Sequence, residues 1–115
     1  MSLDWQYATH RDVTVLTLTG HLGGETTARF VGAIDWVRPR ATGPILLDVT
    51  GLVSWSDDGE AAIVDTARRL GSAEQPLALC GVGDLPTLVI TANRLVPLSV
   101  YPDLDTALDA LASQG

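Results

Sequence analysis

The chain has 115 residues, of which 46% are hydrophobic and 18% charged, so we expect one globular domain, residues 1–115. No apolar run approaches 18 residues and no signal peptide is recognisable, which argues against a membrane span and for a cytoplasmic protein. A single cysteine, Cys80, excludes an internal disulfide framework and fits a reducing compartment. Fourteen acidic against seven basic residues give a net charge of −7, so nucleic acid and anionic lipid are not expected partners.

The first third of the chain predicts a β-hairpin followed by a helix. Residues 5–9 alternate weakly, and residues 13–19 are rich in β-branched side chains, which favours two strands. The short polar break between them predicts an antiparallel pair at the edge of a sheet. Residues 20–24 contain three glycines and predict a loop. A helix is expected from about residue 26, ending before Pro39.

The remaining chain alternates between short apolar strands and helices. Strands are predicted at residues 45–49, 77–80 and within 95–100, and helices from residues 56–58 and after Asp84 and Asp103. The order is therefore β-β-α-β-α-β-α-β-α. Strands separated by helices indicate an α/β fold, a mixed and mostly parallel sheet of about five strands with four helices.

The most informative stretch lies where the strand at 45–49 gives way to the second helix. Ser56, Asp57 and Asp58 fall at the helix start, and the spacing of Asp57 and Glu60 matches a capping box with Asp57 as the cap. In open α/β sheets the carboxyl ends of strands and the following helix starts form the usual functional edge. We therefore expect the site to be there.

Three local signatures, in this order and spacing, resemble the STAS domain family (sulphate transporter and anti-sigma factor antagonist). Residues 16–22 are similar to a strand that in the family ends in Gly-Glu-Leu-Asp. Residues 47–52 are similar to Asp-Leu-Ser-Gly-Val, and residues 56–59 to Asp-Ser-Ser-Gly. The tail, residues 100–108, is similar to the closing strand and helix of the family. The resemblance implies a STAS-like fold over nearly the whole chain.

The resemblance also implies a function in signalling rather than catalysis. Bacterial single-domain members bind an anti-sigma factor kinase and release its sigma factor, until the kinase phosphorylates the second serine of Asp-Ser-Ser-Gly. Asp58 takes the place of that serine, Asp57 that of the first serine, and His21 and Gly23 replace the Glu and Asp of the first loop. Phosphorylation at this position is therefore excluded. Asp58 either imitates the phosphorylated state or only stabilises the helix start. A switch moved to Ser54 or Ser56 is a third reading.

The expected binding surface combines the loop at 20–24 with the start of the second helix. Its partner is expected to be an anti-sigma kinase or another regulatory protein, and the chain itself a monomer or weak homodimer. We expect no cofactor, metal or catalytic residue. Trp55 is expected to pack under the helix, although an exposed Trp55 would be a natural interface anchor. The residues of this surface are Gly20, His21, Gly23, Trp55, Ser56, Asp57, Asp58, Gly59 and Glu60.

Two other functions stay open from the residues alone. Asp48 could approach Asp57 and Asp58 in space and form the site of a small-ligand binder or an enzyme. The chain could also be a scaffold subunit of a larger signalling assembly. Cys80 lies in an apolar strand and is expected to be a buried, inert thiol.

Overall fold

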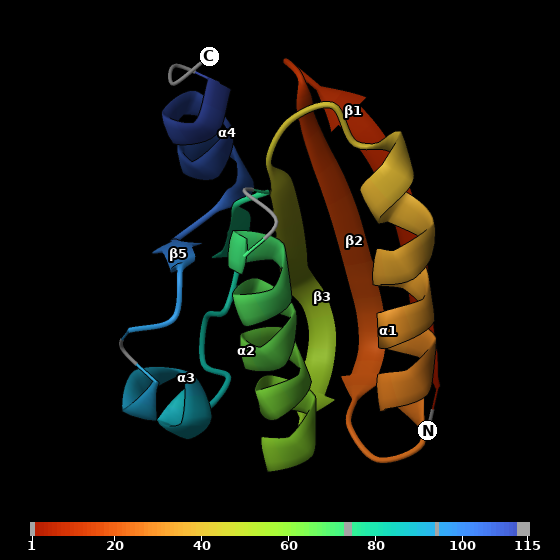
Figure 1. Cartoon of the computed structure of the whole chain (residues 1–115). Helices are drawn as coiled ribbons and strands as arrows, with labels where there is room; N and C mark the ends of the chain where they lie inside the picture. The colour runs from red at the N-terminus through yellow and green to blue at the C-terminus, as the bar shows by residue number, and fades with distance from the viewer. Residues whose placement is uncertain (1, 73–74, 94, 113–115) are drawn as a thin grey trace.

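The structure is a computed structural model that describes residues 2–72, 75–93 and 95–112. One five-stranded sheet in the order β1-β2-β3-β4-β5 forms its centre (Figure 1). The elements along the chain are β1 Leu3–His10, β2 Val13–Leu22, α1 Thr26–Val37, a 3₁₀ turn η1 Arg38–Arg40, β3 Ile45–Trp55, α2 Asp57–Ser72, β4 Leu77–Cys80, α3 Leu88–Ala92, β5 Leu98–Tyr101 and α4 Leu104–Ala112. The predicted order and the mixed α/β class are confirmed.

The hairpin at the start forms the antiparallel edge of the sheet. Leu3 pairs with Gly20 and His10 with Val13, and all other strand pairs are parallel. Arg11 and Asp12 connect the two strands with positive φ angles of 53° and 66°. Two successive positive φ angles are those of the tight turn that matches the twist of paired strands.

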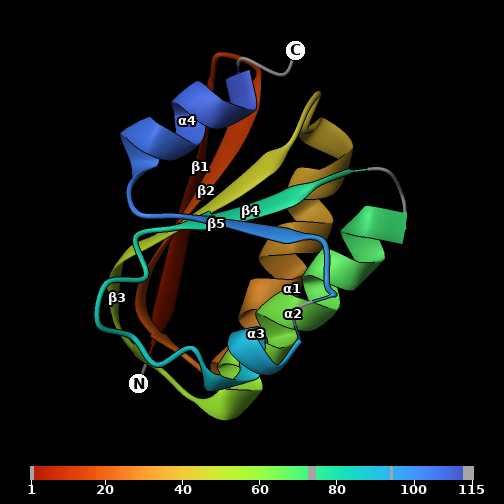
Figure 2. The same cartoon turned by 90° about the vertical axis from the view of Figure 1, so that its left-hand side faces the viewer.

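Helices cover the two faces of the sheet unequally (Figure 2). α1 and α2 lie on one face, over a large core that includes Phe30, Ile34 and Ile63, each fully buried. α4 lies on the opposite face, where Leu108 packs in a smaller core with Val13, Leu46 and Cys80. Strand residues alternate between these cores because successive side chains point to opposite faces. Among the described residues, no helix is both long and apolar enough to cross a lipid bilayer.

Both strands that lead to the expected site are longer than the sequence suggested. β2 continues through Gly20 and His21 to Leu22, so residues 20–22 are strand and not loop. β3 continues to Trp55 instead of ending near Asp48 or Val49. Gly20 was predicted to lie in a loop, and Gly51 lies beyond the predicted strand, but the sheet includes both and needs glycine there. A Cβ at Gly20 would collide with the carbonyl oxygen of Ser2, and one at Gly51 with the Thr19 side chain.

The last third of the chain departs from the predictions in one helix. α3 has only five residues and starts at Leu88, so Asp84 lies in the preceding loop and does not cap it. Pro86 disfavours a helical conformation for Leu85, which argues against a helix that starts directly after Asp84. Asp103 does cap α4, because its carboxylate accepts the backbone N–H of Thr106 at 2.8 Å. Hydrogen bonds from the backbone N–H and then the side chain of Thr106 lower the pKa of Asp103.

Candidate functional site

The expected site lies at one end of the sheet, where β2 and β3 finish side by side. His21 pairs with Ser54 and Leu22 with Trp55 in the last two positions of the ladder. The chain then leaves β2 for α1 and β3 for α2. The backbone N–H of Ser56 donates to the carbonyl oxygen of Leu22 at 3.0 Å, so the segment after β2 and the segment after β3 lie side by side. The two segments that the sequence assigned to one surface are therefore adjacent.

The carboxylate of Asp58 links the segment after β2 to the segment after β3. Oδ2 accepts the backbone N–H of Gly24 at 2.8 Å, and Oδ1 accepts the hydroxyl of Ser56. The Ser56 hydrogen bond and then the Gly24 N–H lower the pKa of Asp58, because both stabilise the ionised form. Asp58 is exposed, so a fixed negative charge faces solvent at the start of α2.

Asp57 and Glu60 do not form the predicted capping box. α2 begins at Asp57, so the preceding residue, Ser56, takes the cap position, and Asp57 is exposed. Glu60 is fully buried and points to α3, where its Oε2 accepts the backbone N–H of Ile90 at 2.8 Å. Its Oε1 is buried with no hydrogen-bond partner among the described residues. Glu60 was expected on the binding surface and instead lies beneath it.

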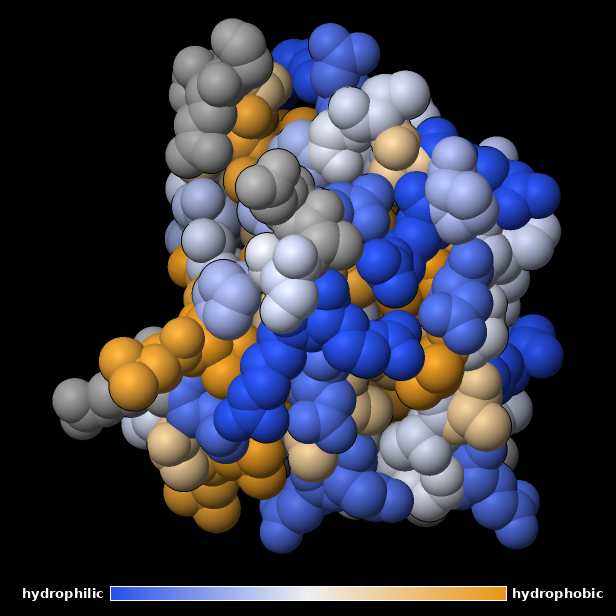
Figure 3. Space-filling view, in the orientation of Figure 1, coloured by the Kyte–Doolittle hydropathy of each residue, from blue (hydrophilic) through white to orange (hydrophobic). Residues whose placement is uncertain are grey.

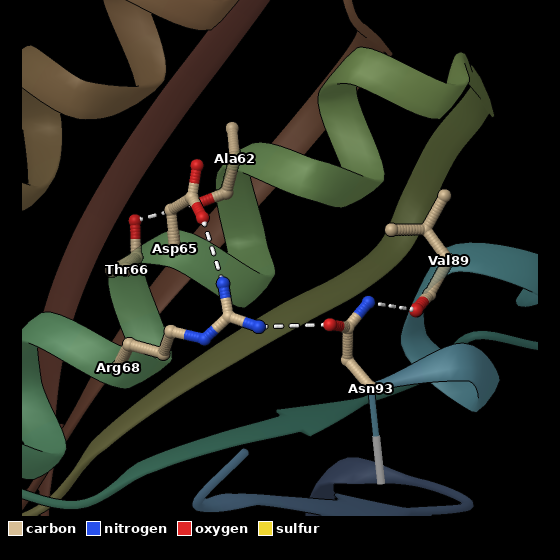
Figure 4. A network of polar contacts seen from close by, with 6 residues as sticks. All are labelled: Ala62, Asp65, Thr66, Arg68, Val89 and Asn93. Carbon is tan, nitrogen blue, oxygen red and sulfur yellow. Dashed lines mark hydrogen bonds and ion pairs between the residues drawn. The ribbon is translucent and has the colours of Figure 1, made fainter. Parts of the chain in front are cut away.

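A second polar contact holds α3 against α2 (Figure 4). Arg68 Nη2 donates to Asn93 Oδ1 at 2.8 Å, and Asn93 Nδ2 donates to the carbonyl oxygen of Val89 at 2.7 Å. Arg68 Nη1 lies 3.4 Å from Asp65 on the same helix. Glu60 thus holds α3 at its middle and Arg68 holds it just past its last residue, although α3 buries none of its own residues.

Two glycines allow the start of α2 to touch the end of β2. Gly59 is buried, and a Cβ there would collide with the carbonyl oxygen of Leu22. Gly23 is also buried, and a Cβ there would collide with the Ser56 hydroxyl. Thr26 holds the same loop, since its Oγ1 accepts the N–H of Gly23 at 2.9 Å. Both glycines therefore shape the site without offering a side chain to a partner.

Trp55 is 6% exposed, so it packs under α2 as expected and does not act as an exposed anchor. Its indole Nε1 donates to the carbonyl oxygen of Pro86 at 2.7 Å. His21 is half-buried within β2, and its Nδ1 lies 2.7 Å from Ser54 Oγ. The site is thus held from two sides, by the loop before α3 and by a cross-strand polar pair.

Asp48 does not join the other carboxylates, contrary to the second reading of the sequence. It pairs with Thr17 and Cys80 in the middle of the sheet, and its carboxylate accepts the N–H and hydroxyl of Thr50 at 3.0 and 2.6 Å. The strand from Asp48 to Trp55 spans roughly 20 Å at the usual rise per residue. Asp48 and Asp58 therefore cannot act on one small substrate.

Exposed apolar side chains near the site were not predicted. Val53 on β3 is 84% exposed, Leu88 at the start of α3 is 75% exposed, and Leu95 after it is fully exposed. Figure 3 shows a hydrophobic region over α3, beside the hydrophilic surface of α2. The helix predicted after Asp84 was expected to bury its apolar residues, but Leu88 is exposed because α3 is short.

The fold is that of the STAS domain, as the comparison with solved structures shows. A Thermotoga maritima protein described as an anti-sigma factor antagonist superposes with a TM-score of 0.78 at 18% identity, over 93% of each chain. An anti-sigma factor antagonist from Mycobacterium paratuberculosis gives 0.76 at 20% identity, over 96% of this chain and 94% of the other. A chain of the stressosome, described as a signal integration and transduction hub, gives 0.63 at 16% identity, over 95% and 97%. No protein-family model and no curated protein sequence matches the chain.

Proposed function

We propose that the protein is an anti-sigma factor antagonist that binds an anti-sigma kinase or a related regulatory protein. The binding surface is the end of the sheet where β2 meets α1 and β3 meets α2. Its exposed members are Asp57 and Asp58, with His21 and Ser56 half-buried between them. The proposal is supported by the fold and by the structural neighbours, several of which are anti-sigma factor antagonists.

One observation carries the proposal: Asp58 stands where the family's phosphoacceptor serine is expected, and its carboxylate already accepts two hydrogen bonds. Gly24 and Ser56 both donate to its carboxylate, so the loop before α1 is tied to the start of α2. A phosphoserine would carry roughly −1.5 to −2 charges where Asp58 carries about −1. The chain is therefore a permanent imitation of the phosphorylated, weakly binding form.

The substitution Asp58→Ser tests this function. It restores a hydroxyl acceptor and removes the charge, so the cognate kinase should phosphorylate residue 58. Before phosphorylation it should bind the variant at least about fivefold more tightly, which is the lower end of usual coupling between a switch and a binding site. Phosphopeptide mapping and calorimetry with the purified kinase give the two readouts.

Asp65→Ser is the matched control, because it removes one exposed carboxylate from the same helix at a distance from Gly24. It should change neither readout. If Asp58→Ser behaves like this control, Asp58 only stabilises the start of α2, and the proposal that it imitates phosphoserine is rejected. If neither wild type nor variant binds the kinase, the proposed partner class is wrong.

A scaffold subunit is the second candidate, because a stressosome chain shares the fold over nearly all of its length. The two candidates differ in size in solution. A monomer or weak homodimer supports the antagonist, and a large homomeric particle by light scattering supports the scaffold. An enzyme using Asp48 together with Asp58 loses its basis, because the two carboxylates lie at separate places.

A further inference from the structure

β1 forms one edge of the sheet, and no other strand in the described part of the chain pairs with its outer side. Exposed edges are usually protected against pairing with another chain by short length, proline, lysine or a bulge. β5, at the opposite edge, has this protection, because it has four residues and lies between Pro97 and Pro102. β1 has eight residues without proline or lysine, and its ladder with β2 runs without a register shift. The β1 edge is therefore open to a further strand.

The free hydrogen-bonding groups of this edge follow from the pairing of β1 with β2. The carbonyl oxygen of Ser2 accepts the N–H of His21 at 2.9 Å, so these two residues form one of the hydrogen-bonded pairs of the hairpin. The N–H of Thr14, in contrast, turns away from β1 and donates to the carbonyl oxygen of Pro44 at 3.1 Å. Hydrogen-bonded and non-hydrogen-bonded pairs alternate along an antiparallel ladder. The residues of β1 whose N–H and C=O groups point to the free edge are therefore Leu3, Trp5, Tyr7 and Thr9.

These outward groups select one register for a second copy of the chain. The carbonyl oxygen of Leu3 already accepts Arg29 Nε, which closes this end of the edge. Trp5, Tyr7 and Thr9 remain, and an antiparallel copy uses all of their backbone groups when the two-fold axis passes through Tyr7. Tyr7 then faces Tyr7 of the second copy, Trp5 faces Thr9 of the second copy, and each pair exchanges two backbone hydrogen bonds. Such an edge is its own complement, as a two-fold interface requires.

The side chains on both faces of β1 suit the same register. On the face covered by α1, Tyr7 is 43% exposed and packs edge-on against Trp36, which is 39% exposed, with ring centroids 4.9 Å apart. The axis through Tyr7 joins this aromatic pair to that of the second copy, and aromatic cross-strand pairs stabilise sheets. On the opposite face, Asp4 comes to lie opposite His10 of the second copy. A carboxylate accepts an imidazole N–H in either protonation state of the ring, so the two groups are complementary.

We propose that the protein forms a two-fold homodimer through β1, in which two copies share one continuous sheet. One strand edge and a few side chains make a contact smaller than the roughly 1,200–2,000 Å² of stable complexes, so the dimer is weak and depends on concentration. Gly20, near the end of β2, pairs with Leu3, which lies four positions from the axis at Tyr7. The two Asp58 sites are then at opposite ends of the seam, with the β2 ends roughly 27 Å apart along the strands. Each copy thus keeps its own surface for a regulatory partner.

Sedimentation equilibrium of the whole chain, from about 10 μM to 1 mM, tests the dimer. The average mass of the wild type should rise with concentration toward twice that of one chain. Tyr7→Lys puts two like charges opposite each other on the axis and removes the aromatic pair, so it should weaken the association at least about tenfold. Val100→Lys is the matched control, because Val100 is 51% exposed on the other edge strand, and it should leave the association unchanged.

Engineered cysteines test the register. Tyr7→Cys places two thiols in one hydrogen-bonded pair, whose Cα atoms are about 5.5 Å apart and within reach of a disulfide. Thr9→Cys places its two thiols four positions apart, at roughly 13 Å, which is too far. Under mild oxidation, Tyr7→Cys should form a covalent dimer at least about ten times faster than Thr9→Cys. Cys80 is buried and does not take part.

A chain that stays monomeric at all concentrations overturns the proposal, as does an association that Tyr7→Lys leaves unchanged. Equal cross-linking rates of the two cysteine variants reject the register and with it the proposed dimer. Thermal unfolding of every variant checks its fold, and the cross-linking comparison decides if Tyr7→Lys does not fold. None of these substitutions touches Ser56 or Asp58, so the dimer can fail while the antagonist function stands, and the reverse.

Discussion

Asp58 and Glu60 lie two positions apart in the first turn of α2, yet their carboxylates have opposite surroundings. Neighbours at this spacing point to different sides of a helix. Asp58 faces solvent and accepts hydrogen bonds from Gly24 and Ser56, whereas Glu60 is fully buried and accepts one from Ile90. A buried polar oxygen without a partner costs about 1–3 kcal/mol. Glu60 therefore positions α3 at a cost to stability.

Replacing Glu60 by glutamine should lower that cost. Glu60→Gln keeps an oxygen for the Ile90 N–H, and a neutral amide is cheaper to bury than a carboxylate. The free energy of unfolding at pH 7 should rise by about 1 kcal/mol, measured by urea denaturation. Asp105→Asn, an exposed substitution on α4, should leave it unchanged. A less stable Glu60→Gln variant would show that the carboxyl group itself is needed.

At the scale of elements, the site depends on how closely α2 approaches the end of β2. Gly59 makes this contact possible, because its missing side chain leaves space for the Leu22 carbonyl. Gly32, at an exposed position of α1, has open space where a Cβ would lie. Both glycines are in helices, but only Gly59 is required to lack a side chain by its contact with another element.

Alanine at these two positions should have opposite effects. Gly59→Ala forces α2 away from β2 and should destabilise the protein by about 1–3 kcal/mol, as overpacking does. Gly32→Ala lowers the entropy of the unfolded chain and should stabilise it by about 0.4–1 kcal/mol. Thermal unfolding of both variants measures this. Equal shifts of the same sign would contradict the packing described for Gly59.

How far the sequence predicts these elements depends on the range of the interactions that set them. The hairpin, the order of elements and the Asp103 cap follow from local patterns, and the structure confirms them. The extensions of β2 and β3 follow from pairing between distant segments, which continues both strands past Gly20 and Gly51. The burial of Glu60 was likewise hidden, because the partner N–H of Ile90 lies thirty residues further on.

At the scale of the whole molecule, β4 lies between the two cores and carries the single cysteine. Cys80 is fully buried, and burial, with the nearby charge of Asp48, raises the pKa of its thiol to about 12. At pH 8 only about one thiol in ten thousand is then ionised, and the thiolate is the reactive form. Cys80 is therefore a reporter of opening of the entire fold.

Iodoacetamide should not modify Cys80 in the native protein at pH 8 on the timescale on which it modifies the protein in urea. The rate should increase in Gly59→Ala, because that variant opens more often. Intact-mass spectrometry follows the reaction. Fast modification of the native wild type would show that β4 opens without the rest of the molecule.

β3 continues past its last pair with β4, and this overhang carries the site. From Val49 to Trp55 the strand has β2 on one side, while on the other side Gly81 crowds Thr50 and Pro86 accepts the Trp55 indole N–H. The end of β3 that carries the site is thus paired with β2 but lies beyond the β3–β4 ladder. A side chain at this end, such as that of Asp58, can therefore be exchanged without disturbing the pairing of β3 with β4.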